Sequence, residues 1–252
     1  MRELVICSMS GGLDSSTLVA KALTEGKEVV PVNFIYGQKN IVETEAQKNV
    51  WCNLKERFPD TLQETIVLDV QSFLGRAVET FQKNRDNGVA NDTTGMEFYF
   101  PSRNLLFMAV SAVVGEIIAN DKSIKKIGLG LGIHKHSDIY AKDYWDISPE
   151  FADKLTELLS LNDNVECYVY APYKSGFKSE IIKDVEKLKV PYELTWTCYD
   201  PKLHNTFEKK GKLFETYVAC GKCEACLERQ TQAKDSSVYD TINSYSITIP
   251  KE

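Results

Sequence analysis

The sequence predicts an α/β protein built on a doubly wound parallel sheet, followed by a small cysteine-rich C-terminal segment. Short apolar runs bounded by turn residues alternate with longer segments of helical period, which is the pattern of β-α-β units. A pair of glycines, Gly11 and Gly12, directly follows the first apolar run. Near the C-terminus, three cysteines crowd into one short stretch, a spacing typical of a metal site.

The elements follow one another in the order that such a sheet requires. Segment 28–36 has the continuous apolar character of a buried parallel strand, and 41–58 repeats its apolar residues at helical spacing. Segment 105–120 is apolar nearly all round, which predicts a helix buried in the core. The polar stretch 82–95 predicts a loop. Expected strands are 4–7, 28–36, 64–69, 126–131, 165–170 and 245–249, and expected helices are 14–23, 41–58, 105–120, 149–161 and 177–188.

Composition narrows the class of protein. The chain has 252 residues, of which 26% are charged and 43% hydrophobic, so we expect a globular fold. We assign residues 1–192 to one α/β domain and 193–252 to a segment packed on it. A net charge of −6 argues against a surface built to hold nucleic acid. The apolar stretch 105–114 is too short to span a bilayer and no leader precedes the first strand, so we expect a cytoplasmic protein without a membrane partner.

The turn after the first strand has the features of an anion site. Two adjacent glycines let the backbone turn sharply and approach a ligand, and the helix that follows offers free amide groups and its positive dipole end. Hydroxyls in the same stretch suit an oxygen-rich group such as pyrophosphate. The turn lacks the lysine of a Walker A loop and does not match G-x-G-x-x-G. The residues concerned are Ser10, Gly11, Gly12, Leu13, Asp14, Ser15, Ser16 and Thr17.

Four cysteines in two segments predict a structural zinc site. The Gly221-Lys222 pair allows a tight knuckle whose backbone amides bond to sulfur, and four thiolates leave no open position on the metal. An iron-sulfur cluster is the alternative, because C-x2-C-x2-C also occurs in ferredoxins, where a fourth Cys and a Pro follow closely. The ligands that we assign are Cys198, Cys220, Cys223 and Cys226.

The other cysteines and one arginine lead to separate expectations. Cys7, Cys52 and Cys167 lie in apolar segments, where we expect small core residues rather than reactive thiols. Arg103 stands at the entrance of the apolar helix, a costly place for a charge unless it faces an anion. Segment 132–149 concentrates His, Asp and aromatic residues, and we interpret it as a substrate loop.

Taken together, the motifs resemble those of the 7-cyano-7-deazaguanine synthase family of PP-loop ATP pyrophosphatases, nearly from end to end. The resemblance rests on Ser10-Gly11-Gly12-Leu13-Asp14-Ser15, Tyr36-Gly37-Gln38 with Glu43, Arg103-Asn104, Pro172 with Lys178, Thr195-Trp196-Thr197-Cys198-Tyr199, and Cys220-Gly221-x-Cys223-x-x-Cys226.

The resemblance implies a PP-loop sheet, a zinc site at the four cysteines, and conversion of 7-carboxy-7-deazaguanine to the nitrile with ATP and ammonia. In this family ATP would convert the carboxylate to an acyl adenylate, since oxide is a poor leaving group. The implied roles are ATP binding by Ser10 to Ser16, Mg²⁺ binding with ATP at Asp14, charge balance on the phosphates by Arg103 and Lys178, and substrate binding by Tyr36, Gln38, Glu43, Asn104, Asp138 and Asp146.

Three departures from the family pattern fall on the substrate side. Lys39-Asn40 stand where the family has Arg-His, and Ser102 stands where it has a glycine. Residues 144–148 stand where the family has a YPDCR element, and so lack its arginine. Lys135, Lys142 or His134 could take the place of that arginine. The span between Cys198 and Cys220 also predicts an inserted loop near the zinc.

These departures leave several alternatives open. The enzyme could stop at the amide, or couple the activated deazaguanine to another amine, including one on a protein. A PP-loop tRNA thiolase and an ATP-sensing module are further alternatives for the function.

The C-terminal strand 245–249 leaves a separate choice open. It could pair within its own chain or with a second subunit in a homodimer.

Overall fold

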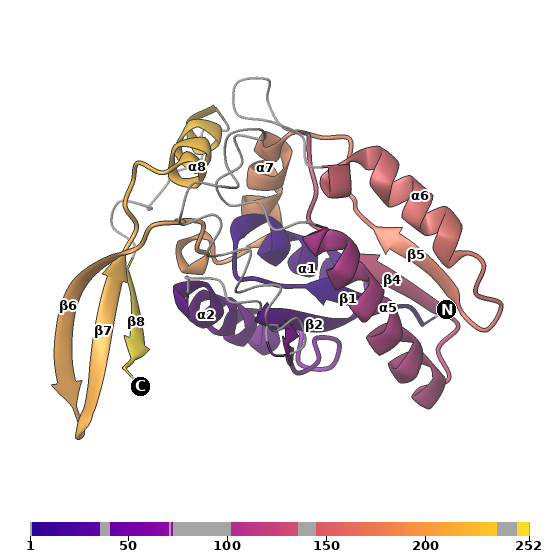
Figure 1. Cartoon of the computed structure of the whole chain (residues 1–252), viewed down its shortest axis with the longest axis horizontal. Helices are drawn as coiled ribbons and strands as arrows, with labels where there is room; N and C mark the ends of the chain where they lie inside the picture. The colour runs from indigo at the N-terminus through magenta and orange to yellow at the C-terminus, as the bar shows by residue number, and fades with distance from the viewer. Residues whose placement is uncertain are drawn as a thin grey trace.

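The computed structural model describes residues 2–35, 41–70, 72, 102–135, 145–235 and 246–251. Its main sheet is parallel, with strand order β3-β2-β1-β4-β5 (Figure 1). The predicted doubly wound parallel sheet is confirmed. Chain connections leave β1 toward β2 on one side and reach β4 on the other, so the topological switch point lies between β1 and β4. The strands are β1 Leu4–Ser8, β2 Glu28–Ile35, β3 Ile66–Asp69, β4 Lys126–Gly130 and β5 Glu166–Tyr170.

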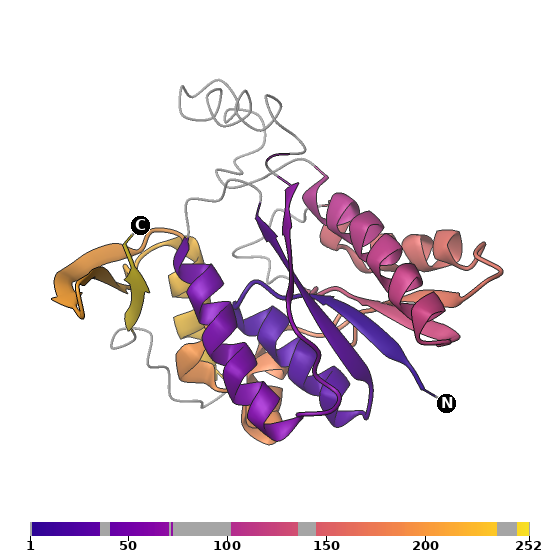
Figure 2. The same ribbon diagram turned by 90° about the horizontal axis from the view of Figure 1, so that it is seen from below.

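Helices cover both faces of this sheet (Figure 2). The strand β1 alternates between two cores, because Val5 and Cys7 face one helix layer while Leu4 and Ile6 face the other. All four side chains are fully buried, and burial of one such aliphatic side chain contributes about 1.5–3 kcal/mol. One layer holds α1 Leu13–Thr24, α2 Ile41–Arg57 and α7 Lys178–Leu188, and the other holds α5 Arg103–Asp121 and α6 Pro149–Leu159.

Helix α5 is less buried than its composition predicts. Phe107, Met108 and Gly115 pack on the sheet, but Val113 and Ile117 are 59% and 63% exposed. The expectation of a wholly buried helix is therefore wrong, because a helix lying on one face of a sheet buries a single side. By length and composition alone, the whole of α5 could cross a membrane; the expectation concerned only its part 105–114. Its inner side packs against β1 and β4.

The C-terminal segment adds a second sheet. Its antiparallel strand order is β6-β7-β8, and the β6–β7 hairpin extends away from the main sheet (Figure 1). Lys210 and Gly211 form the hairpin turn with positive φ angles of 52° and 74°, as a primed turn requires. This hairpin is what the sequence predicted as an inserted loop. The elements are β6 Lys202–Lys209, β7 Lys212–Val218, α8 Glu224–Asp235 and β8 Ser246–Pro250, with short 3-10 helices at Trp145–Ile147 and Tyr192–Leu194.

The C-terminal strand pairs within its own chain. Strand β8 lies against β7, and Ile247 and Ile249 are buried against Val42 and Ala46 of α2.

The three cysteines outside the cluster, which were all predicted to be core residues, differ in their burial. Cys7 and Cys167 are buried core residues as expected, but Cys52 is exposed on α2, so its assignment to the core is wrong. Cys52 lies on the side of α2 opposite the buried Val50 and Leu54.

Candidate active site and metal centre

The loop between β1 and α1 is shaped by its first glycine. Gly11 has φ +91°, and a Cβ atom there would lie 2.4 Å from the backbone nitrogen of Gln47 and 2.6 Å from the carbonyl oxygen of Glu43. Helix α2 therefore packs directly on the loop backbone, and only glycine fits. Gly12 is the N-cap residue of α1 and makes no side-chain capping bond, which leaves the first-turn amides of α1 without a side-chain cap.

The hydroxyls of this loop divide into two groups. Ser16 is fully buried and donates to the Gly12 carbonyl oxygen at 2.7 Å, and Thr17 likewise donates to Leu13 at 2.8 Å. Ser10 is exposed, and its Oγ lies 3.3 Å from the Ser15 Oγ. Ser15 is half-buried, and its Oγ also lies 3.2 Å from the Gly12 carbonyl oxygen. Of the predicted ATP ligands, Ser10 therefore presents its hydroxyl at the loop surface and Ser15 in part, whereas the Ser16 hydroxyl is buried.

A charged cluster lies beside the loop at the switch point. Lys178, at the start of α7, is 6% exposed and lies between two carboxylates, with Nζ 3.6 Å from Asp14 Oδ2 and 3.0 Å from Glu228 Oε2. Burial alone would lower the pKa of Lys178, but the two carboxylates outweigh it and raise this pKa above its ordinary value. The buried His134, just after β4, places Nε2 3.8 Å from Asp14 Oδ2, while its Nδ1 lies 2.9 Å from the Lys135 carbonyl oxygen.

A second group of titratable side chains lies near the first. Burial raises the pKa of Glu43 to about 7, although the nearby Arg103 opposes the shift. Desolvation of the hydroxyl group also raises the pKa of Tyr199, although the residue as a whole is 45% exposed, with Lys178 and Arg103 opposing and Glu43 adding to the rise. Three predicted residues that are distant in sequence, Glu43, Arg103 and Lys178, thus act electrostatically on one tyrosine. This arrangement can hold a polyphosphate beside an ionisable carboxyl group.

The entrance of α5 is where Ser102 replaces the glycine of the family pattern. Ser102 is the N-cap residue and has φ +53°, a left-handed conformation that favours glycine. The buried Asp146 then accepts a hydrogen bond from the Asn104 backbone nitrogen at 3.0 Å, so it caps α5 from the short 3-10 helix before α6. Arg103 therefore begins a helix that is fixed from outside by Asp146.

Ser148 has a structural role at the start of α6. Ser148 is the N-cap residue of α6, where its Oγ accepts from the Phe151 backbone nitrogen at 3.0 Å and donates to the Trp145 carbonyl oxygen at 2.9 Å. A serine hydroxyl bonded in this way to its own helix start cannot replace a long cationic side chain. The predicted residues Tyr36, Gln38, Asp138 and Lys142 and the loop 82–95 lie outside the residues that the structure describes.

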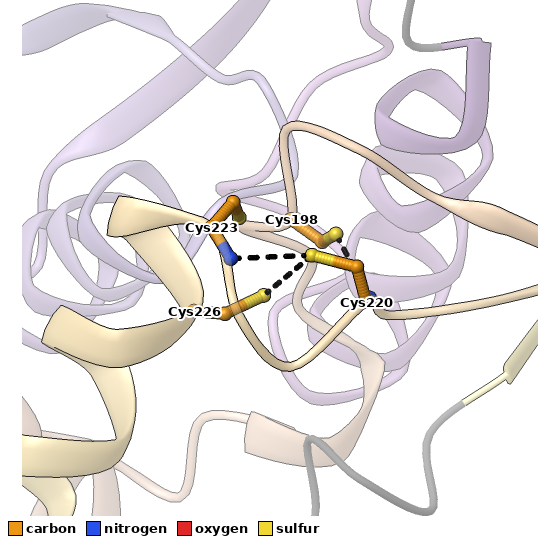
Figure 3. Close-up of side chains that lie close together, drawn as sticks. All are labelled: Cys198, Cys220, Cys223 and Cys226. Carbon is orange, nitrogen blue, oxygen red and sulfur yellow. Dashed lines mark hydrogen bonds between the residues drawn. The ribbon is translucent and has the colours of Figure 1, made fainter.

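The four predicted cysteines meet at one point between 198 and the start of α8 (Figure 3). Their sulfur atoms all lie within 4.8 Å of one another, and Cys220 Sγ is 4.0 Å from Cys226 Sγ. Tetrahedral ligands with Zn–S bonds of about 2.3 Å would place sulfurs about 3.8 Å apart, which matches this spacing. The knuckle amides of Lys222 and Cys223 point at Cys220 Sγ at 3.5 Å and 3.3 Å, and Gly221 has φ +71°. The group can hold a metal ion.

Two contacts that the sequence did not reveal join this centre to the loop. Glu228 lies on α8 two residues after Cys226 and pairs with Lys178. The Trp196 backbone nitrogen donates to the Gly11 carbonyl oxygen at 2.9 Å. The only sequence signal for Glu228 was the need of a buried lysine for a carboxylate partner. The backbone contact of Trp196 left no signal, because any residue type could make it.

Comparison with known proteins decides the family. The profile described as Queuosine biosynthesis protein QueC matches residues 4–236. The chain belongs to the QueC family. A 7-cyano-7-deazaguanine synthase from Picrophilus torridus is 32% identical over 249 residues, covering 94% of this chain and 90% of the relative. Another from Caldicellulosiruptor bescii is 30% identical and covers 99% of both chains.

This membership agrees with the resemblance seen in the motifs, and the QueC relatives are synthases, that is, enzymes. Among solved structures, a 4-thiouridine synthetase in complex with RNA and ATP is similar with a TM-score of 0.42 and 14% identity, covering 99% of this chain and 55% of that one. Assignment to the QueC family therefore comes from the sequence match.

Proposed function

We propose that this protein is a 7-cyano-7-deazaguanine synthase that uses ATP to convert 7-carboxy-7-deazaguanine and ammonia into the nitrile. The observation that carries the proposal is membership of the QueC family together with the loop at Gly11 and its cationic neighbour Lys178. The synthases to which the chain is similar match it along most of their length.

The proposed chemistry balances in two rounds. A carboxylate oxygen attacks the α-phosphorus of ATP and pyrophosphate leaves, which gives an acyl adenylate. Ammonia then attacks the acyl carbon, a proton is lost and AMP leaves, so that a primary amide forms. In the second round the amide oxygen takes the AMP group, pyrophosphate leaves again, and loss of AMP and protons from the imidate gives the nitrile. No nucleophilic side chain is required.

The loop and its neighbours would take separate tasks in this chemistry. The amides from Gly12 onward and the hydroxyls of Ser10 and Ser15 would bind phosphate oxygens. Asp14 would hold Mg²⁺ with ATP, and Lys178 with Arg103 would balance charge that develops on the phosphates. The roles of Asp14 and Lys178 are supported by their position beside the loop.

Glu43 and Asn104 remain proposed substrate ligands with Asp146, whose capping bond at α5 adds a structural task. Tyr36, Gln38 and Asp138 stay predictions from the family pattern. Because Ser148 is engaged in capping α6, it does not take the place of the missing family arginine. His134 is the better supported substitute, since it is buried at the carboxyl end of β4 and faces Asp14, whereas Lys135 is exposed.

We propose that the cysteine centre holds a structural zinc ion. Four thiolates with knuckle amides fill a tetrahedral shell and leave no position for substrate. The close spacing of the sulfurs favours a single ion over an iron-sulfur cluster, whose thiolates ligate different iron atoms and stand farther apart. This also weakens the tRNA thiolase alternative, as does the net charge of −6. A cytoplasmic location fits this function.

The product decides between the proposed function and its alternatives. The protein would be incubated with 7-carboxy-7-deazaguanine, MgATP and ammonium, and the deazaguanine species resolved by mass spectrometry. Nitrile supports the proposal, whereas amide alone, or a conjugate formed only when a protein amine is supplied, favours the divergent enzyme. Pyrophosphate release that does not depend on the deazaguanine carboxylate would refute both readings.

A further inference from the structure

We propose that Glu228 is a positioning residue for Lys178, so that the metal-binding helix α8 sets the geometry of the phosphate site. The inference rests on the proposed function only in taking ATP as the ligand of the loop. Glu228 itself need not touch substrate or nucleotide.

The geometry of Lys178 gives the first step. Its ammonium group ends a flexible four-carbon chain, yet the residue is 6% exposed and its Nζ is nearer to Glu228 than to Asp14, at 3.0 Å against 3.6 Å. When Mg²⁺ and polyphosphate engage Asp14, Glu228 remains as the carboxylate that orients the ammonium group. A lysine without that partner would have several rotamers available.

The position of Glu228 is itself fixed from two sides. Cys226, two residues earlier, is a ligand of the proposed metal centre. Arg229, the next residue, is fully buried and donates to Tyr192 Oη and to the Thr195 carbonyl oxygen, each at 3.1 Å. These contacts determine the rotation of α8 about its axis. The Glu228 side chain is 15% exposed, as expected for a side chain directed into the protein.

The segment that bears the cysteines also contacts the loop at Gly11 directly. Trp196, two residues before Cys198, is 1% exposed and bonds to the Gly11 carbonyl oxygen through its backbone nitrogen. The cysteine segment therefore contacts both the loop backbone and the loop's lysine. We infer that it forms part of the phosphate site as well as stabilising the fold.

Charge balance alone would be a different role with an opposite consequence. If Glu228 only neutralised a buried lysine, removing its negative charge would strengthen MgATP binding, because a polyphosphate nearby would lose a repulsive neighbour. If Glu228 positions Lys178, the same change weakens MgATP binding and lowers turnover. The two roles thus differ in the sign of one measurement.

The test uses the full-length, metal-loaded protein and two readouts: equilibrium MgATP binding by calorimetry and pyrophosphate release. We expect E228Q to weaken MgATP binding and to lower kcat, each by about tenfold, as for loss of a hydrogen bond between charged groups. Metal content and melting temperature should stay unchanged. E228D keeps the charge but shortens the reach, and should also lose activity. E193Q removes an exposed carboxylate on the short helix Tyr192–Leu194, which Arg229 contacts, and should keep full activity.

A double-mutant cycle completes the test. In a K178M background, E228Q should have no further effect on MgATP binding, because the residue through which it acts is gone. Tighter binding in E228Q, full activity in E228D, or an equal loss with and without Lys178 would overturn the inference. The nucleotide-binding arm needs no deazaguanine, so a wild-type protein that binds MgATP but makes no nitrile would refute the proposed function and leave this inference standing.

Discussion

The backbone nitrogen of Trp196 donates a hydrogen bond to the carbonyl oxygen of Gly11 at 2.9 Å. This bond joins the cysteine-bearing segment to the loop at the end of the first strand, across most of the length of the chain. Helix α2 packs on the same glycine from another side, through the backbone of Gln47 and Glu43. The loop is therefore held in place by two elements before any ligand arrives.

Gly11→Ala should abolish pyrophosphate release and destabilise the fold. The new Cβ would lie 2.4 Å from the Gln47 nitrogen, at a backbone angle that favours glycine. We expect a loss of more than about 1 kcal/mol in the free energy of unfolding. Gly26→Ala is the matched control, because Gly26 also has a positive φ angle but has open space around it. It should cost stability and leave turnover intact, and equal activity of the two variants would contradict the role of the loop.

Asp14→Ala should stop pyrophosphate release while the protein stays folded. The substitution leaves Lys178 paired with Glu228, so the buried charge keeps a partner. Unfolding curves would check stability, and a coupled pyrophosphate assay would check turnover. Asp153→Ala removes a more exposed carboxylate that pairs with Lys174 and serves as the control. Unchanged turnover in Asp14→Ala would remove its assigned role in Mg²⁺ binding.

Ser102→Gly should stabilise the protein. Ser102 has φ +53° at the entrance of α5, where glycine carries no steric penalty. We expect the free energy of unfolding, measured by urea denaturation, to rise by about 0.5–1 kcal/mol. This net gain already includes the loss caused by the greater entropy of glycine in the unfolded chain. Ser123, at the other end of α5, has φ +55° and offers a second position for the same substitution. A loss of stability at both positions would argue against the backbone geometry.

The stability of the protein should depend on pH through Glu43. Folding raises the pKa of this carboxyl from 4.5 to about 7. A raised pKa means that its contribution to stability is present below the ordinary value and is lost as the pH rises through about 7. Glu43→Gln should therefore be more stable than wild type in mild alkali, by about 1–3 kcal/mol, with a smaller difference in acid. A constant difference across that range would contradict the assignment.

Cys223→Ser should lose the metal ion and melt at a much lower temperature, because the free energy of metal binding at such a site contributes to the free energy of folding. Elemental analysis and thermal unfolding would measure the two effects. Cys52→Ser changes an exposed cysteine and should alter neither. Retention of full metal content together with unchanged melting in Cys223→Ser would contradict a structural four-cysteine centre.

The sequence predicted the main sheet well, because parallel strands such as β1 are buried on both faces and stand out as apolar runs. It also predicted the cysteine group, whose spacing is local. It failed on α5, since composition shows how apolar a helix is but not which side meets the sheet. It did not identify Glu228 as the partner of Lys178, because a contact between residues fifty positions apart depends on the tertiary fold.

The central claim is that ATP makes the deazaguanine carboxyl group reactive by transfer of AMP at the Gly11 loop. Substrate carrying a heavy oxygen isotope in its carboxylate tests this directly, because the attacking oxygen stays with AMP when the adenylate breaks down. We predict AMP that contains one heavy oxygen atom, detected by mass spectrometry and dependent on ammonium. Unlabelled AMP, or ADP in its place, would contradict the account.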